Sequence, residues 1–423
     1  MLSLNFIREN TQEVIDRLSI KNFNGVEIIA RIVELDNQRR ETQKKLDDSQ
    51  SQSNILAKEI GTLFQAGKIA EANRLKETTG ELKAQAKEFD LALENIKIEL
   101  EEILIRVPNL PHASVPLGKT PEDNIIVAAE GEAKPAAASS VPHWDLATRY
   151  DIIDFNTGNK ITGAGFPLYK GKGARLQRAL INFFLEEALK AGYTEVQPPY
   201  LVNAASAYAT GQLPDKDAQM YHAGLDDLYL IPTAEVPVTN IYRDTILKSQ
   251  DLPVKNVAYS ACFRREAGSY GKDVRGLNRL HQFDKVEIVQ ISHPDQSYKI
   301  LEEMRNHVTG LLRKLELPFR ALKLCGGDMS FTSALTYDME VWSSAQARWL
   351  EVSSVSNFES FQSNRLKLRF KDETGKMQTA HTLNGSALAL PRIMAALLEN
   401  NQTKDGIRIP GVLVPYAGFE EIN

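Results

Sequence analysis

The chain has 423 residues, of which 43% are hydrophobic and 25% charged, and its formal net charge is −5. This length permits a large catalytic domain with a smaller appendage, while the nearly neutral charge excludes binding of nucleic acid by bulk charge alone. Two cysteines, Cys262 and Cys325, are too few for a disulfide framework or a four-cysteine zinc site, and without an apolar leader or spanning segment we expect a cytoplasmic protein.

Residues 5–24 predict a short helical cap, and two long helices follow it. In both, mainly apolar or small residues recur at alternating spacings of four and three, which is the pattern of a coiled coil. The first series is Ile28, Ile32, Leu35, Arg39, Thr42, Leu46, Ser49, Ser53, Leu56, Ile60 and Leu63, and the second is Ala72, Leu75, Thr79, Leu82, Ala86, Phe89, Leu93, Ile96, Leu100, Ile103 and Val107.

The gap between the two series, around Gly67, has room only for a turn, so we expect an antiparallel hairpin about 55–60 Å long. A dimerisation coiled coil is the alternative. The short turn argues against it, because each helix already has a partner within the chain.

A domain boundary is expected near residue 110. Pro108 and Pro111 stop the second helix, and residues 111–142 are rich in Pro, Ala and Gly, which predicts an extended linker. The expected domains are therefore a hairpin arm over 1–110 and a mixed globular domain over 111–423. A helix over 173–191 and a strand interrupted by Pro198 and Pro199 come next.

A loop containing glycines is flanked by the residues most suited to nucleotide chemistry. Arg264, Arg265 and Glu266 precede it, and Phe283 and Glu287 follow it. Arginine grips phosphate through two parallel hydrogen bonds, glycine admits close backbone approach, and Phe283 offers a face for a base. The pattern suits a nucleoside triphosphate beside a small amine-bearing substrate. An exposed loop with ordinary salt bridges is the alternative.

Thr233 and Glu235 precede this loop and offer a hydroxyl and an ammonium acceptor, although a capping Thr and a surface Glu would give the same pattern. Further along, Glu351 and Ser354 at a strand end could hold Mg²⁺ on ATP phosphates, or simply bond to each other. Arg392 lies within an apolar helix pattern, where a buried guanidinium needs an anionic or stacking partner.

No phosphate loop of the Gly-x-x-x-x-Gly-Lys type and no dinucleotide fingerprint occurs, which favours a nucleotide site on antiparallel strands. Together, the arginine loop, the segment 233–235, the Glu351 segment, the stretch 381–399 and the hairpin resemble seryl-tRNA synthetases of class II over essentially the whole chain. The resemblance implies an α+β fold, with an antiparallel sheet of six or seven strands and an N-terminal two-helix coiled-coil arm. It also implies a homodimer, with the helix 173–191 and the following strand at the subunit interface.

The implied activity is ATP-dependent formation of seryl-adenylate and transfer of serine to tRNA(Ser), and the family also suggests tRNA(Sec). The resemblance assigns Arg264 and Arg392 to catalysis. Implied serine-binding residues are Thr233, Ala234, Glu235, Arg264, Glu287, Asn384 and Ser386; implied ATP-binding residues are Arg264, Arg265, Glu266, Phe283, Glu351, Val352, Ser353, Ser354 and Arg392, with Glu351 and Ser354 as Mg²⁺ ligands.

Because little chain follows the last of these segments, the arm is expected to carry most of the RNA recognition. Candidate contacts are Arg31, Arg39, Arg40, Lys44, Lys45 and Lys58, which could equally be a solvated helix face. Two rival functions remain. A ligase that does not use tRNA would lack the long hairpin, and a regulatory relative would lack a phosphate-gripping arginine or a metal ligand; the hairpin, Arg264, Arg392 and Glu351 are all present.

Overall fold

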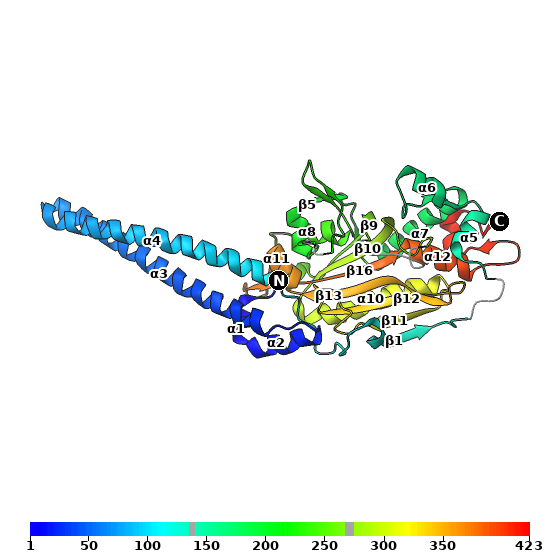
Figure 1. Ribbon diagram of the computed structural model, residues 1–423, viewed down its shortest axis with the longest axis horizontal. Coiled ribbons are helices and arrows are strands. Elements are labelled where there is room, and N and C mark those ends of the chain that lie inside the picture. Colours follow the sequence, from blue (N-terminus) through cyan, green and yellow to red (C-terminus); the bar gives the residue numbers. More distant parts are fainter. Residues whose placement is uncertain (135–139, 216, 267–274) are drawn as a thin grey trace. The chain divides into compact units, whose positions relative to one another are not determined.

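The computed structural model describes residues 1–134, 140–215, 217–266 and 275–423 (Figure 1). Its contacts divide the chain into two compact units, Met1–Ser19 with Phe23–Pro108, and Ile20–Asn22 with Asn109–Asn423. Residues 267–270 of the predicted loop motif and 136–138 of the predicted linker lie outside the described residues.

The first unit is helical. It contains α1 (Leu4–Glu9), α2 (Thr11–Ile20), α3 (Val26–Gln65) and α4 (Ile69–Leu104). The two long helices pack against each other and are joined by a tight turn at Gly67, whose φ of 75° is the left-handed conformation that glycine adopts freely (Figure 1). The predicted antiparallel hairpin is therefore confirmed.

The buried residues of the hairpin follow the predicted series. Leu46, Ser49 and Ser53 of α3 and Ala72 and Thr79 of α4 are all buried. Because small residues occupy the middle of the seam, the two backbones can approach closely there, but little apolar area is removed from water. The middle of the arm is consequently held together weakly.

A charged group is buried where the arm begins, and the heptad series does not contain it. Asp36 is 1% exposed and accepts hydrogen bonds from Arg8 of α1, at 2.7 Å, and from Arg39 one turn along α3, at 2.8 Å. Burial by itself raises the pKa of Asp36, but the hydrogen bonds from Arg39 and Arg8 outweigh it and leave the pKa lowered. Asp36 therefore ties α1 to α3.

The second unit is built on an eight-stranded sheet with the order β1-β11-β12-β13-β16-β10-β9-β4. The strands are β1 (Ile125–Glu130), β4 (Thr194–Glu195), β9 (Val254–Phe263), β10 (Gln282–Ser292), β11 (Phe319–Lys323), β12 (Leu335–Ser343), β13 (Arg348–Glu359) and β16 (His381–Ala389). All neighbours pair antiparallel except β4 and β9. The antiparallel α+β fold is confirmed.

The sheet has one or two strands more than expected. The extra edge strand β1 lies in the segment predicted as linker and pairs with β11. Its Ile125-Ile126-Val127 run has high strand propensity, and the surrounding alanines and prolines obscured that signal.

Helices cover both faces of the sheet, and the alternation of β10 separates the two sides. Val286 and Ile288 face the main apolar core, while Val289 packs against α9 (Glu235–Asn240). The remaining helices of this unit are α5 (His143–Arg149), α6 (Phe155–Ile161), α7 (Gly171–Lys190), α8 (Ala204–Thr210), α10 (Ser297–Lys314), α11 (Phe361–Leu366), α12 (Leu390–Asn400) and α13 (Val414–Ala417). In the described ranges, no helix combines the length and apolar character needed to cross a membrane.

Shorter strands form small satellite sheets around this core. They are β2 (Ile153–Asp154) with β3 (Leu168–Tyr169); β5 (Leu201–Asn203), β7 (Leu228–Leu230) and β6 (His222–Ala223); β8 (Ile246–Lys248), β14 (Arg369–Lys371) and β15 (Met377–Thr379); and β17 (Ile407–Arg408) with β18 (Glu421–Ile422).

Replacing the buried carboxylate at the base of the arm should destabilise the first unit. Asp36→Asn leaves two arginines without their counter-charge, so we expect its unfolding free energy to fall by about 1–3 kcal/mol in urea titrations followed by circular dichroism. Asp47→Asn, the same change at an exposed position of α3, is the control, expected within about 0.5 kcal/mol of the parent. Equal effects of the two substitutions would show that the Asp36 contacts add nothing.

Candidate functional site

The candidate site begins on the two central strands, β10 and β16. Glu287 of β10 is paired directly with Ser386 of β16, and Asn384 lies on the same face of β16 as Ser386. The segment leading into α9 covers this face, where Ala234 packs against Val289. Strand register therefore brings the predicted serine-binding residues of β10, β16 and segment 233–235 together.

Hydrogen bonds converge on the Glu287 carboxylate, which is 2% exposed. Thr233 Oγ1 and Ser386 Oγ each donate to Glu287 Oε2 at 3.4 Å. Lys285 forms an ion pair with Glu287 and donates from Nζ to Thr233 Oγ1 at 2.8 Å. Lys285 was not among the predicted site residues, although a lysine two positions before Glu287 in an apolar strand must share the face of that glutamate.

A second buried carboxylate, Glu235, completes this pocket. It accepts a 2.6 Å hydrogen bond from Gln362 Nε2, and burial together with the nearby charge of Glu287 raises its pKa to about 7. The described residues of the pocket include two carboxyl groups and one cationic side chain, Lys285. The Asn384 side-chain nitrogen is buried and makes no well-formed hydrogen bond within the described residues. The pocket thus has one cation for two carboxyl groups, and the Asn384 amide lies close enough to Glu235 to counteract part of the rise in its pKa.

Arg264 lies between this pocket and an aromatic ring. It follows the last residue of β9, and its Nε donates to the carbonyl of Pro232 at 3.3 Å. Its guanidinium lies 5.2 Å from the ring centre of Phe283, a cation–π distance. One arginine therefore contacts both the segment that carries Thr233 and the surface expected to receive a base.

The neighbouring residues of the loop have other contacts. Arg265 stacks over Tyr221 at 5.6 Å, and its backbone N–H donates to the Gln219 carbonyl at 2.8 Å. Glu266 accepts from Arg279 Nη1 at 3.0 Å. Both therefore link the loop to its surroundings, and their part in ATP binding remains a prediction.

Arg392, in the first turn of α12, donates hydrogen bonds to two backbone carbonyls from other parts of the chain. Its Nε donates to Asn278 O at 3.0 Å and its Nη1 to Glu351 O at 2.7 Å. Its side chain is 27% exposed, so the group is partly buried rather than turned into solvent. Because arginine has five N–H donors, the edge away from these carbonyls can still meet an anion.

Oxygen ligands gather beside Arg392. Ser354 Oγ lies 3.4 Å from Glu351 Oε1, and Asp338, which pairs with Ser354 across β12 and β13, has a buried oxygen without a hydrogen-bond partner in the described ranges. Burial and the charge of Glu351 raise the pKa of Asp338. Carboxylate and hydroxyl oxygens are the protein ligands that Mg²⁺ prefers, so these residues fit that ion.

Strand pairing places these groups at one end of the sheet. Phe263, just before Arg264, pairs with Gln282 at the start of β10, and Ala389, three residues before Arg392, pairs with Lys285. Since adjacent strands are about 4.8 Å apart, the two arginines enter the site from strands only two spacings apart.

The side chains of three predicted residues are occupied by contacts within the chain. Ala234 packs in a small apolar cluster, Val352 belongs to the main core, and Ser353 donates its hydroxyl to Ser386 O at 2.6 Å. Any contact of theirs with a ligand must use the backbone.

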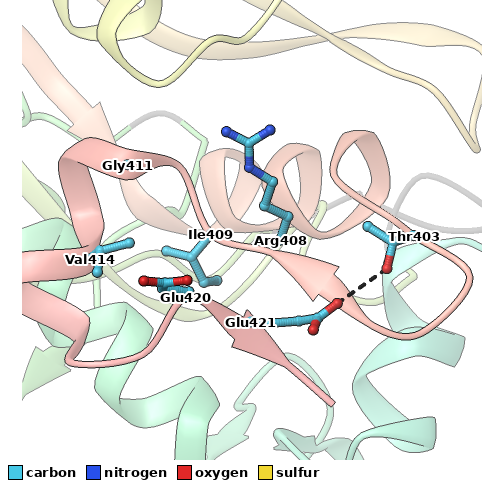
Figure 2. Close-up of a pocket in the computed structure, with 7 residues that line it drawn as sticks. All are labelled: Thr403, Arg408, Ile409, Gly411, Val414, Glu420 and Glu421. Carbon is cyan, nitrogen blue, oxygen red and sulfur yellow. Dashed lines mark hydrogen bonds between the residues drawn. The ribbon is translucent and has the colours of Figure 1, made fainter.

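A separate cavity of about 560 Å³ lies beside the paired strands β17 and β18 (Figure 2). Arg408, Glu420 and Glu421 help to line it, and Thr403 Oγ1 lies 3.2 Å from Glu421. It shares no residue with the site described above.

Comparisons with known proteins identify the family of the chain. Residues 1–111 match the model of the seryl-tRNA synthetase N-terminal domain, and residues 220–401 match that of the tRNA synthetase class II core domain (G, H, P, S and T). A serine–tRNA ligase of Salinibacter ruber is 50% identical over 424 residues, which cover 100% of this chain and 99% of the relative.

Solved structures of seryl-tRNA synthetases also resemble this chain over its whole length. The seryl-tRNA synthetase of Pyrococcus horikoshii, complexed with ATP, superposes with a TM-score of 0.93 at 34% identity, covering 100% of this chain and 99% of that one. The cytoplasmic serine–tRNA ligase of Naegleria fowleri, in complex with AMP, gives 0.89 at 25% identity, again covering 100% and 99%. This chain belongs to the seryl-tRNA synthetase family of class II aminoacyl-tRNA synthetases.

Proposed function

We propose that this chain uses ATP to activate L-serine and then transfers the seryl group to the 3′ end of tRNA(Ser). The observation that carries the proposal is the pocket of Thr233, Glu235, Lys285, Glu287 and Ser386, which lacks one positive charge and holds hydroxyl-binding groups. A small amino acid with an ammonium and a hydroxyl supplies both. Its carboxylate is then directed toward Arg264 at the pocket edge.

In the first step a serine carboxylate oxygen attacks the α-phosphorus of ATP, and pyrophosphate leaves. The nucleophile is already ionised, so the chain's contribution is positioning and charge stabilisation rather than proton removal. Arg264 holds the serine carboxylate beside the α-phosphate, and Phe283 supports the adenine. Arg392 holds the terminal phosphate with the guanidinium edge that faces away from Asn278 and Glu351.

Glu351 and Ser354 are proposed to hold Mg²⁺, with Asp338 behind them. When bound, the ion neutralises charge on the ATP phosphates. The role of this chain is to present carboxylate and hydroxyl oxygens on adjacent positions of one sheet face. The uncompensated oxygen of Asp338 supports this proposal.

The arm is proposed to bind tRNA. The structure separates five of the six candidate basic residues into two groups, while Lys45 is exposed but lies about 100° from Lys44 around the helix. Arg31 forms an ion pair with Glu99 at 2.6 Å and Arg39 with Asp36 at 2.8 Å, so both guanidinium groups already have acidic partners within the arm. Arg40, Lys44 and Lys58 are exposed, and at 100° per residue they fall within about 40° of one another on α3. They form one basic stripe, interrupted by the exposed Asp47, that is available to a phosphate backbone.

Assembly and location complete the proposal. We infer a homodimer that uses the α7 region, as the resemblance implies, and a cytoplasmic site of action, which fits the free thiols Cys262 and Cys325.

Serine-dependent exchange of labelled pyrophosphate into ATP tests the proposed function. Serine should support exchange at least about 10³-fold more efficiently than alanine, because alanine leaves buried polar groups unpaired. Threonine and cysteine complete the comparison, and tRNA(Ser) and tRNA(Sec) are compared as acceptors in the charging step. Exchange that prefers threonine or alanine would overturn the substrate assignment.

Removing the charge of Glu235 should weaken serine binding specifically. In Glu235→Gln the ammonium loses a buried partner, worth about 2–4 kcal/mol, so the KM for serine should rise roughly 30- to 1000-fold while the KM for ATP stays nearly constant. Glu195→Gln, an exposed glutamate on an edge strand of the same sheet, is the matched control. An unchanged serine KM in Glu235→Gln would refute the ammonium role.

The basic stripe on α3 can be tested without disturbing the sheet. Replacing Arg40, Lys44 and Lys58 by Ala should lower kcat/KM for tRNA by about 10-fold or more. The slope of log kcat/KM against log salt concentration should also become shallower, by up to about 1 for each lost phosphate contact. Exchange with serine and ATP alone should be unaffected. Full charging activity and an unchanged salt dependence would remove the stripe from the tRNA interface.

A further inference from the structure

A fully buried histidine–carboxylate pair lies behind the ATP side of the site. His143, the first residue of α5, and Glu399, near the end of α12, both have completely buried side chains. His143 Nδ1 lies 2.7 Å from Glu399 Oε1, and the His143 backbone N–H donates to the same oxygen at 3.0 Å. Neither residue touches the serine pocket or was predicted from sequence.

The other ring nitrogen of His143 contacts the loop that leads to β10. The Leu277 backbone N–H donates to His143 Nε2 at 2.8 Å, so Nε2 is an acceptor and the ring donates through Nδ1 to Glu399. Gly276, with φ of 66°, fits tightly against the same ring, since a Cβ there would lie 2.3 Å from Nε2. The histidine therefore fixes the backbone of residues 276–277.

The next residue of that segment positions Arg392. Asn278 O accepts from Arg392 Nε at 3.0 Å, and its side-chain Nδ2 donates to Gln346 Oε1 at 3.0 Å. Gln346 in turn donates to Glu399 Oε1 at 3.1 Å. A closed set of contacts thus runs from Glu399 through His143 and the 276–278 segment to Arg392.

The geometry of α12 makes this arrangement coherent. Arg392 and Glu399 are seven residues apart, two helical turns, and so lie on one face of α12. Burial by itself raises the pKa of Glu399, but hydrogen bonds from His143 and Ser343 outweigh it and leave the pKa lowered. The carboxylate is accordingly a fixed acceptor around which the segment is ordered.

We propose that His143 and Glu399 are positioning residues for ATP: they hold the 276–278 backbone so that Asn278 O fixes the guanidinium of Arg392 toward the phosphates. This inference rests on the proposed function of the site. It predicts an effect on ATP but not on serine, whereas a purely structural role would affect the two substrates alike.

Two substitutions separate the contacts of His143. His143→Asn keeps a donor near the Nδ1 position but removes the acceptor for Leu277 N, whereas the longer amide of His143→Gln can supply an acceptor near Nε2. We expect His143→Asn to weaken ATP binding about 10-fold in calorimetric titrations of the full-length protein and to leave the KM for serine within about twofold. His143→Gln should recover most of the ATP affinity.

A double-mutant cycle tests the connection to Arg392. If His143 acts through that arginine, His143→Asn should add little to the loss of ATP affinity caused by Arg392→Ala. Multiplicative effects, or unchanged ATP affinity in folded His143→Asn, would overturn the inference. If His143→Asn does not fold, Ser343→Ala is a milder variant, because it removes one hydrogen bond to Glu399 and touches neither the loop nor Arg392. We expect it to lower ATP affinity by less than His143→Asn does. An unchanged ATP affinity in Ser343→Ala would then overturn the inference.

Measurements on the unsubstituted protein distinguish failure of the proposed function from failure of the positioning role of His143. Parent protein that binds ATP but shows no serine-dependent exchange contradicts the proposed function. Parent protein that exchanges normally while its His143 variants bind ATP with full affinity contradicts only the positioning role.

Discussion

The ion pair between Lys285 and Glu287 on β10 is the interaction on which the site depends. Both side chains are almost completely buried, and they share the face that carries the pocket. Removing one partner of such a pair typically costs about 3–5 kcal/mol, because the other charge is left unpaired. The lysine therefore supplies the counter-charge for an acidic group inside the sheet, and the two side chains order Thr233 and Ser386 by hydrogen bonds.

The same pair explains why the pocket suits an amino acid. One lysine cannot balance two carboxylates, and the second, Glu235, has a pKa raised to about 7 by burial and by Glu287. A substrate ammonium completes the balance. In the proposed function, the carboxylate of that substrate meets Arg264, which also contacts the ring of Phe283, so one arginine would serve both the amino acid and the nucleotide.

Sequence patterns predicted the features that repeat along the chain or belong to a continuous motif. The heptad series predicted the hairpin and its seam, and the motifs singled out residues of β10 and β16 that strand register brings together, whose part in serine binding remains a prediction. Features whose recognition depends on distant partners or on a masked local signal were not predicted. His143 and Glu399 are 256 positions apart, Asp36 lies beside the heptad seam rather than in it, and β1 was obscured by a linker-like composition. Val352 and Ser353 show the converse limit, because a motif cannot tell which side of a strand faces a ligand.

The most direct test of this charge arrangement is the number of protons released when serine binds. Because the pKa of Glu235 is raised to about 7 in the free pocket, the group is mostly protonated at pH 6 and mostly ionised at pH 8. An incoming ammonium favours the carboxylate and expels that proton. Calorimetric titrations in buffers of different ionisation enthalpy should therefore show about one proton released per serine at pH 6 and close to none at pH 8. Serine binding at pH 6 without proton release would contradict the account.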